Sequence, residues 1–207
     1  MAAAGFGRLL LASALLFCFV GNCHGEVFFA NLTRTLEVTA TFQNGTNLQA
    51  GESTITVTWG LNATFPSGTD SLYESVKVRL CYAPVSQVYR AWRATKEPLS
   101  KDKTCQFKIA ASKYAKGTTT VQWLVQKTTP TAYYFVRVYA LDKAGHEVAY
   151  GQTTDAHKKE NIFFIEAISG RHTSLDIASV CFSAFSVVSL AGFFYMEKRK
   201  AKRASHN

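Results

Sequence analysis

The chain has 207 residues, of which 18% are charged and 47% hydrophobic, with a formal net charge of +9. That length suits one domain with a sizeable core plus terminal segments. We expect no nucleic-acid partner, because +4 of the net charge falls in the last eleven residues and no nucleic-acid-binding motif occurs.

The N-terminus has the pattern of a secretory signal. Arg8 precedes an apolar run over residues 9–20, and Cys23 and Gly25 place small residues at −3 and −1 of a cleavage site. An uncleaved signal anchor is the alternative, but the run is short for a membrane span. We therefore expect residues 1–25 to be a signal peptide and the mature chain to begin on the secreted side.

The cysteines agree with an oxidising compartment. With Cys18 and Cys23 in the signal and Cys181 in a later apolar segment, Cys81 and Cys105 are the remaining pair. Such a pair predicts a disulfide, the alternative being two buried free thiols. No CxxC spacing or nearby His/Cys cluster indicates zinc, and we expect no metal and no cofactor.

Three N-x-T triplets lie on the secreted side, within 34 residues of one another. They begin at Asn31, Asn44 and Asn62, and together they predict a glycosylated surface. Asn44 precedes a glycine, so a tight turn is an alternative explanation of that triplet.

Short alternating segments dominate the region from residue 26 to residue 153, without helical runs. Their spacing predicts an all-β, immunoglobulin/fibronectin III-like sandwich. Residues 56–59 resemble the second fibronectin III strand with its core tryptophan, and Tyr134 occupies the place of that fold's corner tyrosine. The seven predicted strands are residues 34–40, 53–59, 75–82, 106–109, 119–126, 133–140 and 147–150.

The strand faces can be assigned from their alternation. Ile55, Val57 and Trp59 share one face, and residues 76, 78, 80 and 82 face inward while Cys81 points to the opposite face. Residues 154–176 are expected to be a juxtamembrane stalk. Within them, residues 162–165 are either an eighth edge strand or an apolar patch near the membrane.

Residues 177–195 carry no charge and no proline, and as a helix they would be about 28 Å long. We predict a membrane span over residues 177–196, with a buried core helix as the alternative. Five basic residues and one acidic residue follow in 197–207, which predicts a cytosolic tail and an extracellular N-terminal domain.

Catalytic constellations are not apparent. We find no Gly-rich phosphate loop, GxSxG or HExxH, and the sparse carboxylates do not suggest the paired acids of a glycan hydrolase. We do not expect an enzyme.

The strand pattern breaks between residues 84 and 104, where Trp92 is flanked by Arg90 and Arg93. Tryptophan and arginine are enriched at interface hot spots, and a disulfide-tied loop loses less entropy on docking. A solvated charged insertion, whose tryptophan covers the sandwich edge, is the alternative.

Residues 90–93 followed by residues 101–105 resemble the plant high-affinity nitrate transporter-activating proteins, and the likeness covers the whole chain. The resemblance implies an accessory subunit in the plasma membrane. Its partner would be a many-span nitrate/proton symporter of the major facilitator class, whose stability, surface delivery and activity it supports. It would have no small-molecule substrate of its own.

Residue type favours Arg90 and Trp92 as members of a partner-binding site. The resemblance adds Arg93 and Asp102, because the family's arginine and aspartate at the matching positions are implicated in partner association. Arg93 can make a bidentate bond to a partner, and Asp102 can accept from a partner's cation or fix the loop from within. Alternatively, Arg93 and Asp102 bond to each other and only hold the loop's shape. The competing functional class is a single-span adhesion or receptor protein, for which an eleven-residue tail leaves no room for a signalling domain.

Overall fold

The computed structural model describes residues 26–43 and 45–204. The predicted signal peptide and the candidate glycosylation site Asn44 lie outside the described residues. The described chain forms two compact units that divide after Ala167, a β-domain and a helical unit.

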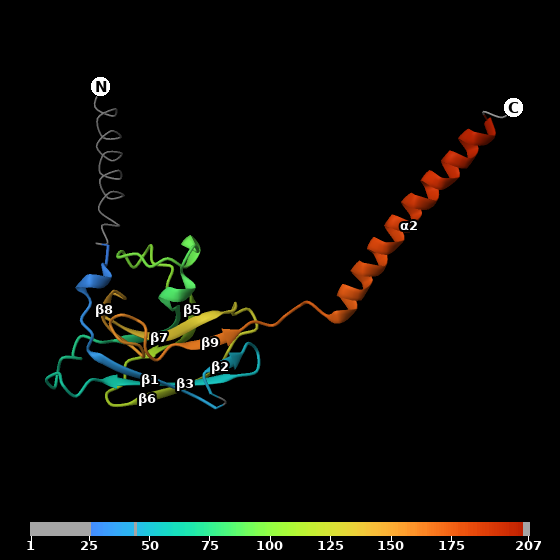
Figure 1. Cartoon of the computed structure of the whole chain (residues 1–207). Coiled ribbons are helices and arrows are strands. Elements are labelled where there is room, and N and C mark those ends of the chain that lie inside the picture. Colours follow the sequence, from blue (N-terminus) through green and yellow to red (C-terminus); the bar gives the residue numbers. More distant parts are fainter. Residues whose placement is uncertain (1–25, 44, 205–207) are drawn as a thin grey trace, which may run out of the picture. The chain divides into compact units, whose positions relative to one another are not determined.

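The β-domain is a sandwich of two sheets (Figure 1). One sheet has the strand order β1-β3-β6, and the other has the order β2-β9-β7-β4-β5, with β8 also paired to β7. The strands are β1 (Leu36–Phe42), β2 (Asn47–Gln49), β3 (Thr54–Leu61), β4 (Ser75–Tyr82), β5 (Phe107–Lys113), β6 (Thr119–Leu124), β7 (Ala132–Leu141), β8 (Glu147–Gln152) and β9 (Phe163–Glu166); short 3-10 turns occupy Phe29–Asn31, Pro84–Ser86 and Ala91–Arg93.

The core between the sheets follows from the alternation of the strands. In β3, Ile55, Val57 and Trp59 are buried and the intervening residues are partly exposed. The alternate residues 76, 78, 80 and 82 of β4 and 134, 136, 138 and 140 of β7 join the same cluster, while Cys81 belongs to a separate one. The faces predicted for β3 and β4 are therefore confirmed.

The corner tyrosine is also in place. The hydroxyl of Tyr134 donates to the backbone oxygen of Pro130 at 2.6 Å, four residues upstream. Burial raises the pKa of Tyr134 far above its ordinary value, so its hydroxyl stays protonated and able to donate. Together with the buried Trp59, this contact identifies an immunoglobulin-like sandwich.

Two strands were not among the seven predicted. β9 pairs antiparallel with the start of β7 and parallel with the short β2. Of the two alternatives for residues 162–165, the strand is observed, but β9 lies between β2 and β7 rather than at the edge. The domain boundary predicted at residue 153 is therefore too early. A short apolar strand lacks alternation, and only its tertiary pairing identifies it.

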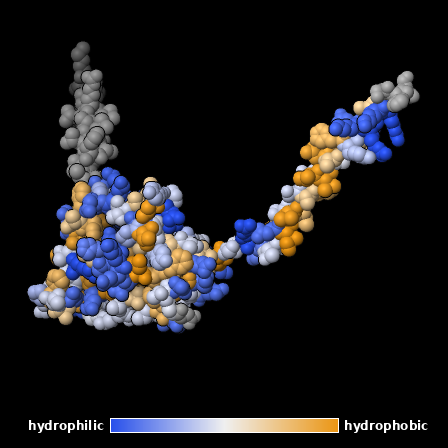
Figure 2. Space-filling model, viewed as in Figure 1, coloured by the Kyte–Doolittle hydropathy of each residue, from blue (hydrophilic) through white to orange (hydrophobic). Residues whose placement is uncertain are grey.

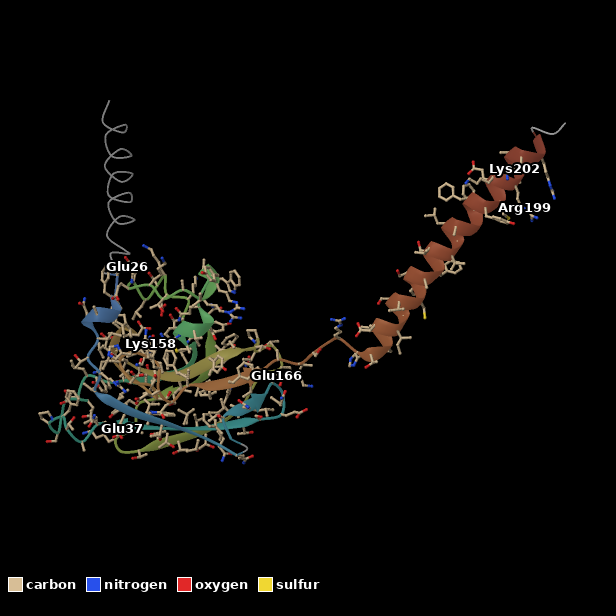
Figure 3. The ribbon with its side chains drawn as sticks, viewed as in Figure 1. Glu26, Glu37, Lys158, Glu166, Arg199 and Lys202 are labelled. Atoms are coloured by element: carbon tan, nitrogen blue, oxygen red, sulfur yellow. A yellow bond between two sulfur atoms is a disulfide. The ribbon has the colours of Figure 1, made fainter. Side chains whose placement is uncertain are left out.

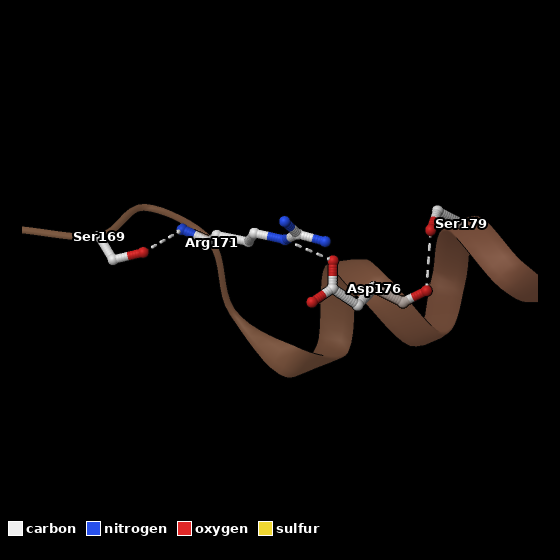
Figure 4. A network of polar contacts seen from close by, with 4 residues as sticks. All are labelled: Ser169, Arg171, Asp176 and Ser179. Atoms are coloured by element: carbon white, nitrogen blue, oxygen red, sulfur yellow. Dashed lines mark hydrogen bonds and ion pairs between the residues drawn. The ribbon is translucent and has the colours of Figure 1, made fainter.

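Helix α2 (Thr173–Ala204) contains the predicted span. It is the one helix in the described chain that is long and apolar enough to cross a membrane. Its apolar side chains cover the middle of the helix and polar ones cover both ends (Figure 2). At its N-terminal end, Arg171 Nε donates to Asp176 Oδ1 at 2.9 Å (Figure 4).

Candidate partner-binding loop

The break in the strand pattern is a covering loop, residues 84–105, which lies on the outer face of the second sheet. Cys81 and Cys105 are joined at an S–S distance of 2.02 Å. Both pack with Phe135 and Ile162 in an apolar cluster outside the main core. The loop is thus tied to β4 at its base.

The N-terminal segment of the described chain is a second anchor for the covering loop. Phe29 N donates to Glu97 O at 2.8 Å, and Leu99 N donates to Val27 O at 2.9 Å. Phe28 forms a β-bridge with Pro98. The sequence did not predict this anchor, because pairing between residues about 70 positions apart leaves no local signal.

Glu26 closes this second anchor (Figure 3). Its carboxylate accepts from Ser100 Oγ at 2.8 Å and lies 3.5 Å from Lys101 Nζ. The hydrogen bond from Ser100 and the charge of Lys101 hold the pKa of Glu26 below its ordinary value.

A buried arginine supports the N-terminal segment from below. Arg137 of β7 is 1% exposed, and its guanidinium lies 4.3 Å from the ring centroid of Phe29. Its nitrogens donate to Gln152 Oε1 at 3.0 and 3.2 Å and to the hydroxyl of Tyr139 at 3.2 Å. Neutral acceptors and aromatic faces offset the desolvation of this cation, so Arg137 stabilises the contact between the sheet and the N-terminal segment.

Arg93 points into the covering loop rather than out of it. Only 7% of the residue is exposed, and its guanidinium lies 4.3 Å from the ring centroid of Tyr82. Nη1 donates to Ser86 O at 3.3 Å. Arg93 therefore joins the 84–93 segment to the sheet beneath it.

Asp102 also works inside the loop. Its Oδ1 accepts from Lys96 N at 3.2 Å, from Thr104 N at 3.1 Å and from Thr104 Oγ1 at 2.7 Å. Within the described chain no ion pair joins Asp102 to Arg93, so the alternative in which the two bond to each other is not observed. Each shapes the loop through different neighbours.

The exposed part of the loop is its tip, defined here as residues 84–92. Trp92 is 64% exposed and Arg90 is exposed beside it. Tyr89, fully exposed with a backbone φ of 56°, was not predicted, and neither were Val85 and Val88. Their only sequence signal was apolar residues in a stretch that forms no strand.

The candidate glycosylation sites differ in setting. Asn31 is exposed, and Asn62 is partly exposed after β3. Asn62 Oδ1 accepts from Thr64 N at 3.0 Å and from Thr64 Oγ1 at 2.9 Å, which forms a compact turn within the triplet.

Pockets and charged clusters give no sign of a reaction centre. A groove of about 780 Å³ runs along β1 and the 152–162 segment, and a cavity of about 190 Å³ lies beneath the loop beside Asp102 and Cys105. Across residues 26–43 and 45–204, no group of three His, Cys, Asp or Glu side chains could hold a metal.

The fold is an immunoglobulin-like domain followed in the chain by one long apolar helix. The family described as "High-affinity nitrate transporter accessory, Ig-like domain" matches residues 29–170, and the chain belongs to this family. The family consists of transporter accessory proteins rather than enzymes, which agrees with the expectation from the sequence.

Relatives match nearly the full length. The chain is 48% identical over 202 residues to "High-affinity nitrate transporter 3.1" of Arabidopsis thaliana, covering 94% of this chain and 96% of that protein. It is 46% identical over 175 residues to "High-affinity nitrate transporter-activating protein 2.1" of Oryza sativa subsp. japonica, covering 84% and 83%. The solved structure of Spo0M, a sporulation control protein from Bacillus subtilis, matches with 13% identity and a TM-score of 0.25 over 65% of this chain and 50% of that one, which carries no argument.

Proposed function

We propose that this protein is the accessory subunit of a high-affinity nitrate/proton symporter of the major facilitator class in the plasma membrane. The β-domain lies outside the cell, α2 crosses the membrane and the basic tail is cytosolic. The subunit stabilises the carrier, supports its delivery to the surface and raises its nitrate uptake. The names of the relatives and the family membership support this role.

Transport itself belongs to the partner. One helix long enough to span occurs in the described chain, and one helix cannot enclose an ion path. The small residues in α2, four serines and a glycine between residues 177 and 195, allow another helix to approach closely. The accessory subunit therefore acts by binding.

The observation that carries the proposal is the covering loop. A disulfide, the N-terminal segment and internal hydrogen bonds restrain it, so docking would cost little conformational entropy. Arg90 and Trp92 are presented to a partner, while Arg93 and Asp102 maintain the presented shape. A restrained loop with an exposed arginine and tryptophan is typical of an interface hot spot.

Nitrate influx in a cell without its own uptake tests the proposal. Expressed alone, the chain should give no saturable influx. Expressed with a cognate carrier, it should raise influx well above that of the carrier alone. Influx from this chain by itself, or no gain with any co-purifying carrier, would refute the accessory role.

The secreted orientation has a separate test. A cleaved signal predicts that the mature chain begins at Glu26, and the three triplets predict glycan on at least one of Asn31, Asn44 and Asn62. N-terminal sequencing and the gel shift after glycosidase treatment measure both. A chain that keeps residues 1–25 and carries no glycan would contradict this topology.

A further inference from the structure

The loop tip gathers exposed apolar side chains more densely than the rest of the β-domain. Val85, Val88, Tyr89 and Trp92 are 56%, 55%, 100% and 64% exposed, and all fall within eight residues. Other exposed apolar residues of the domain, such as Leu72, are isolated along the chain. A concentrated apolar surface of this kind marks an interaction site.

The tip is held in shape by polar contacts at its base. Gln87 Nε2 donates to Tyr82 O at 3.0 Å, and Thr95 Oγ1 donates to Gln87 Oε1 at 3.0 Å. Gln106 Nε2 donates to Trp92 O at 2.6 Å. Exposed side chains on a restrained backbone can enter a partner's pocket at low entropic cost.

The tip arises at the end of the sandwich where the chain leaves towards α2. Ala83 N donates to Tyr133 O at 2.9 Å, and Ala167 N donates to Thr131 Oγ1 at 3.0 Å. Only residues 168–172 separate Ala167 from the first residue of α2, and five residues extend at most about 17 Å. The base of the tip and the start of the connection to α2 therefore belong to the same end of the β-domain.

The charge around the tip is positive. Arg90, Lys96 and Lys103 are exposed, and none has an ion pair within the described residues. The loop's two acidic side chains, Glu97 and Asp102, accept hydrogen bonds from backbone N–H groups. An acidic rim on the partner would complement this surface.

We propose that Tyr89 and Trp92 are the anchors of the complex, inserting into an apolar pocket with an acidic rim on the extracellular surface of the nitrate carrier. Val88 covers the edge of the pocket, and Arg90 pairs with its rim. Arg93 and Asp102 do not touch the carrier. This inference rests on the proposed function and names its contact surface.

Co-purification of the full chain with its carrier tests the anchors. Tyr89→Ala and Trp92→Ala should each weaken association about 30-fold, the size of a hot-spot truncation. Leu72→Ala is the matched control, because Leu72 is 70% exposed and outside the loop, and it should change association less than about twofold. The disulfide and the protease resistance of the domain should be unchanged in all three.

The outcomes separate the two proposals. Wild-type chain that does not co-purify with any nitrate carrier overturns the proposed function. If the wild-type chain co-purifies with the carrier and both Tyr89→Ala and Trp92→Ala bind it equally well, the assignment of the two anchors is overturned and the proposed function stands. If rising salt weakens association of the wild-type chain but not that of Arg90→Ala, the pairing of Arg90 with an acidic rim is supported.

A lipid surface is the competing occupant, and tryptophan fluorescence distinguishes it. Trp59 and Trp123 are buried at 4% and 8% exposure, so Trp92 is the tryptophan that brominated acyl chains could quench. In brominated phosphatidylcholine vesicles without carrier, the tryptophan fluorescence of the wild-type chain should be quenched no more than that of Trp92→Phe. Additional quenching that disappears in Trp92→Phe would overturn the carrier assignment in favour of lipid.

Discussion

Replacing Asp102 by alanine should loosen the covering loop without unfolding the sandwich. The substitution removes one carboxylate oxygen that accepts from Lys96 N, Thr104 N and Thr104 Oγ1. A hydrogen bond to a charged group contributes about 1.5–3 kcal/mol. Each of these three bonds contributes less than that, because Asp102 is partly exposed and all three donors share its Oδ1. We expect the loop to lose about 2–4 kcal/mol in total.

Amide hydrogen exchange measures this loss where it occurs. A loss of about 2 kcal/mol or more should speed exchange at the amides of Lys96 and Thr104 by about 30-fold or more. Asp102→Asn keeps an acceptor oxygen but loses its charge, so its exchange rates at these two amides should lie between those of the wild type and of Asp102→Ala. Glu52→Ala, an exposed residue in a distant turn, serves as the control. Unchanged exchange in Asp102→Ala would show that Asp102 does not hold the loop.

The other predictions concern the sandwich and its connections. Gly151→Ala should destabilise the domain by about 3 kcal/mol, measured by chemical denaturation, because the added Cβ clashes with the β1 backbone; an unchanged midpoint would contradict the close approach of β8 to β1. Non-reducing peptide mapping should recover Cys81 joined to Cys105, and replacing both by serine should cost about 3.5 kcal/mol for a loop of this length, whereas alkylation as free thiols in native membranes would exclude the clamp. The backbone N–H of Glu160, with two further backbone N–H groups, holds the pKa of Asp155 well below its ordinary value. The stability that Asp155 contributes is therefore present above about pH 4 and is lost as pH falls through the folded-state pKa. Asp155→Asn should lower the melting temperature at pH 6, and between pH 6 and pH 3 its melting temperature should fall less than that of the wild type.

Periodicity made the sandwich predictable. Strict alternation in β3 and β4 assigned core faces correctly, because a strand that buries one face must repeat with period two. The uncharged run before the basic tail likewise indicated α2, since length and composition alone decide whether a helix can span a membrane. These features are local, so the sequence contains them.

The tertiary structure decided how the loop works. β9 joins the sheet, and the segment from Glu26 to Phe29 holds the loop, through pairings between distant residues that no local pattern records. Sequence placed Arg93 in a partner-binding set by residue type and resemblance. Packing over Tyr82 buries its guanidinium, whereas Tyr89 is fully exposed. Exposure depends on the direction in which an irregular backbone turns each side chain, and that direction follows from long-range contacts rather than from the order of residues.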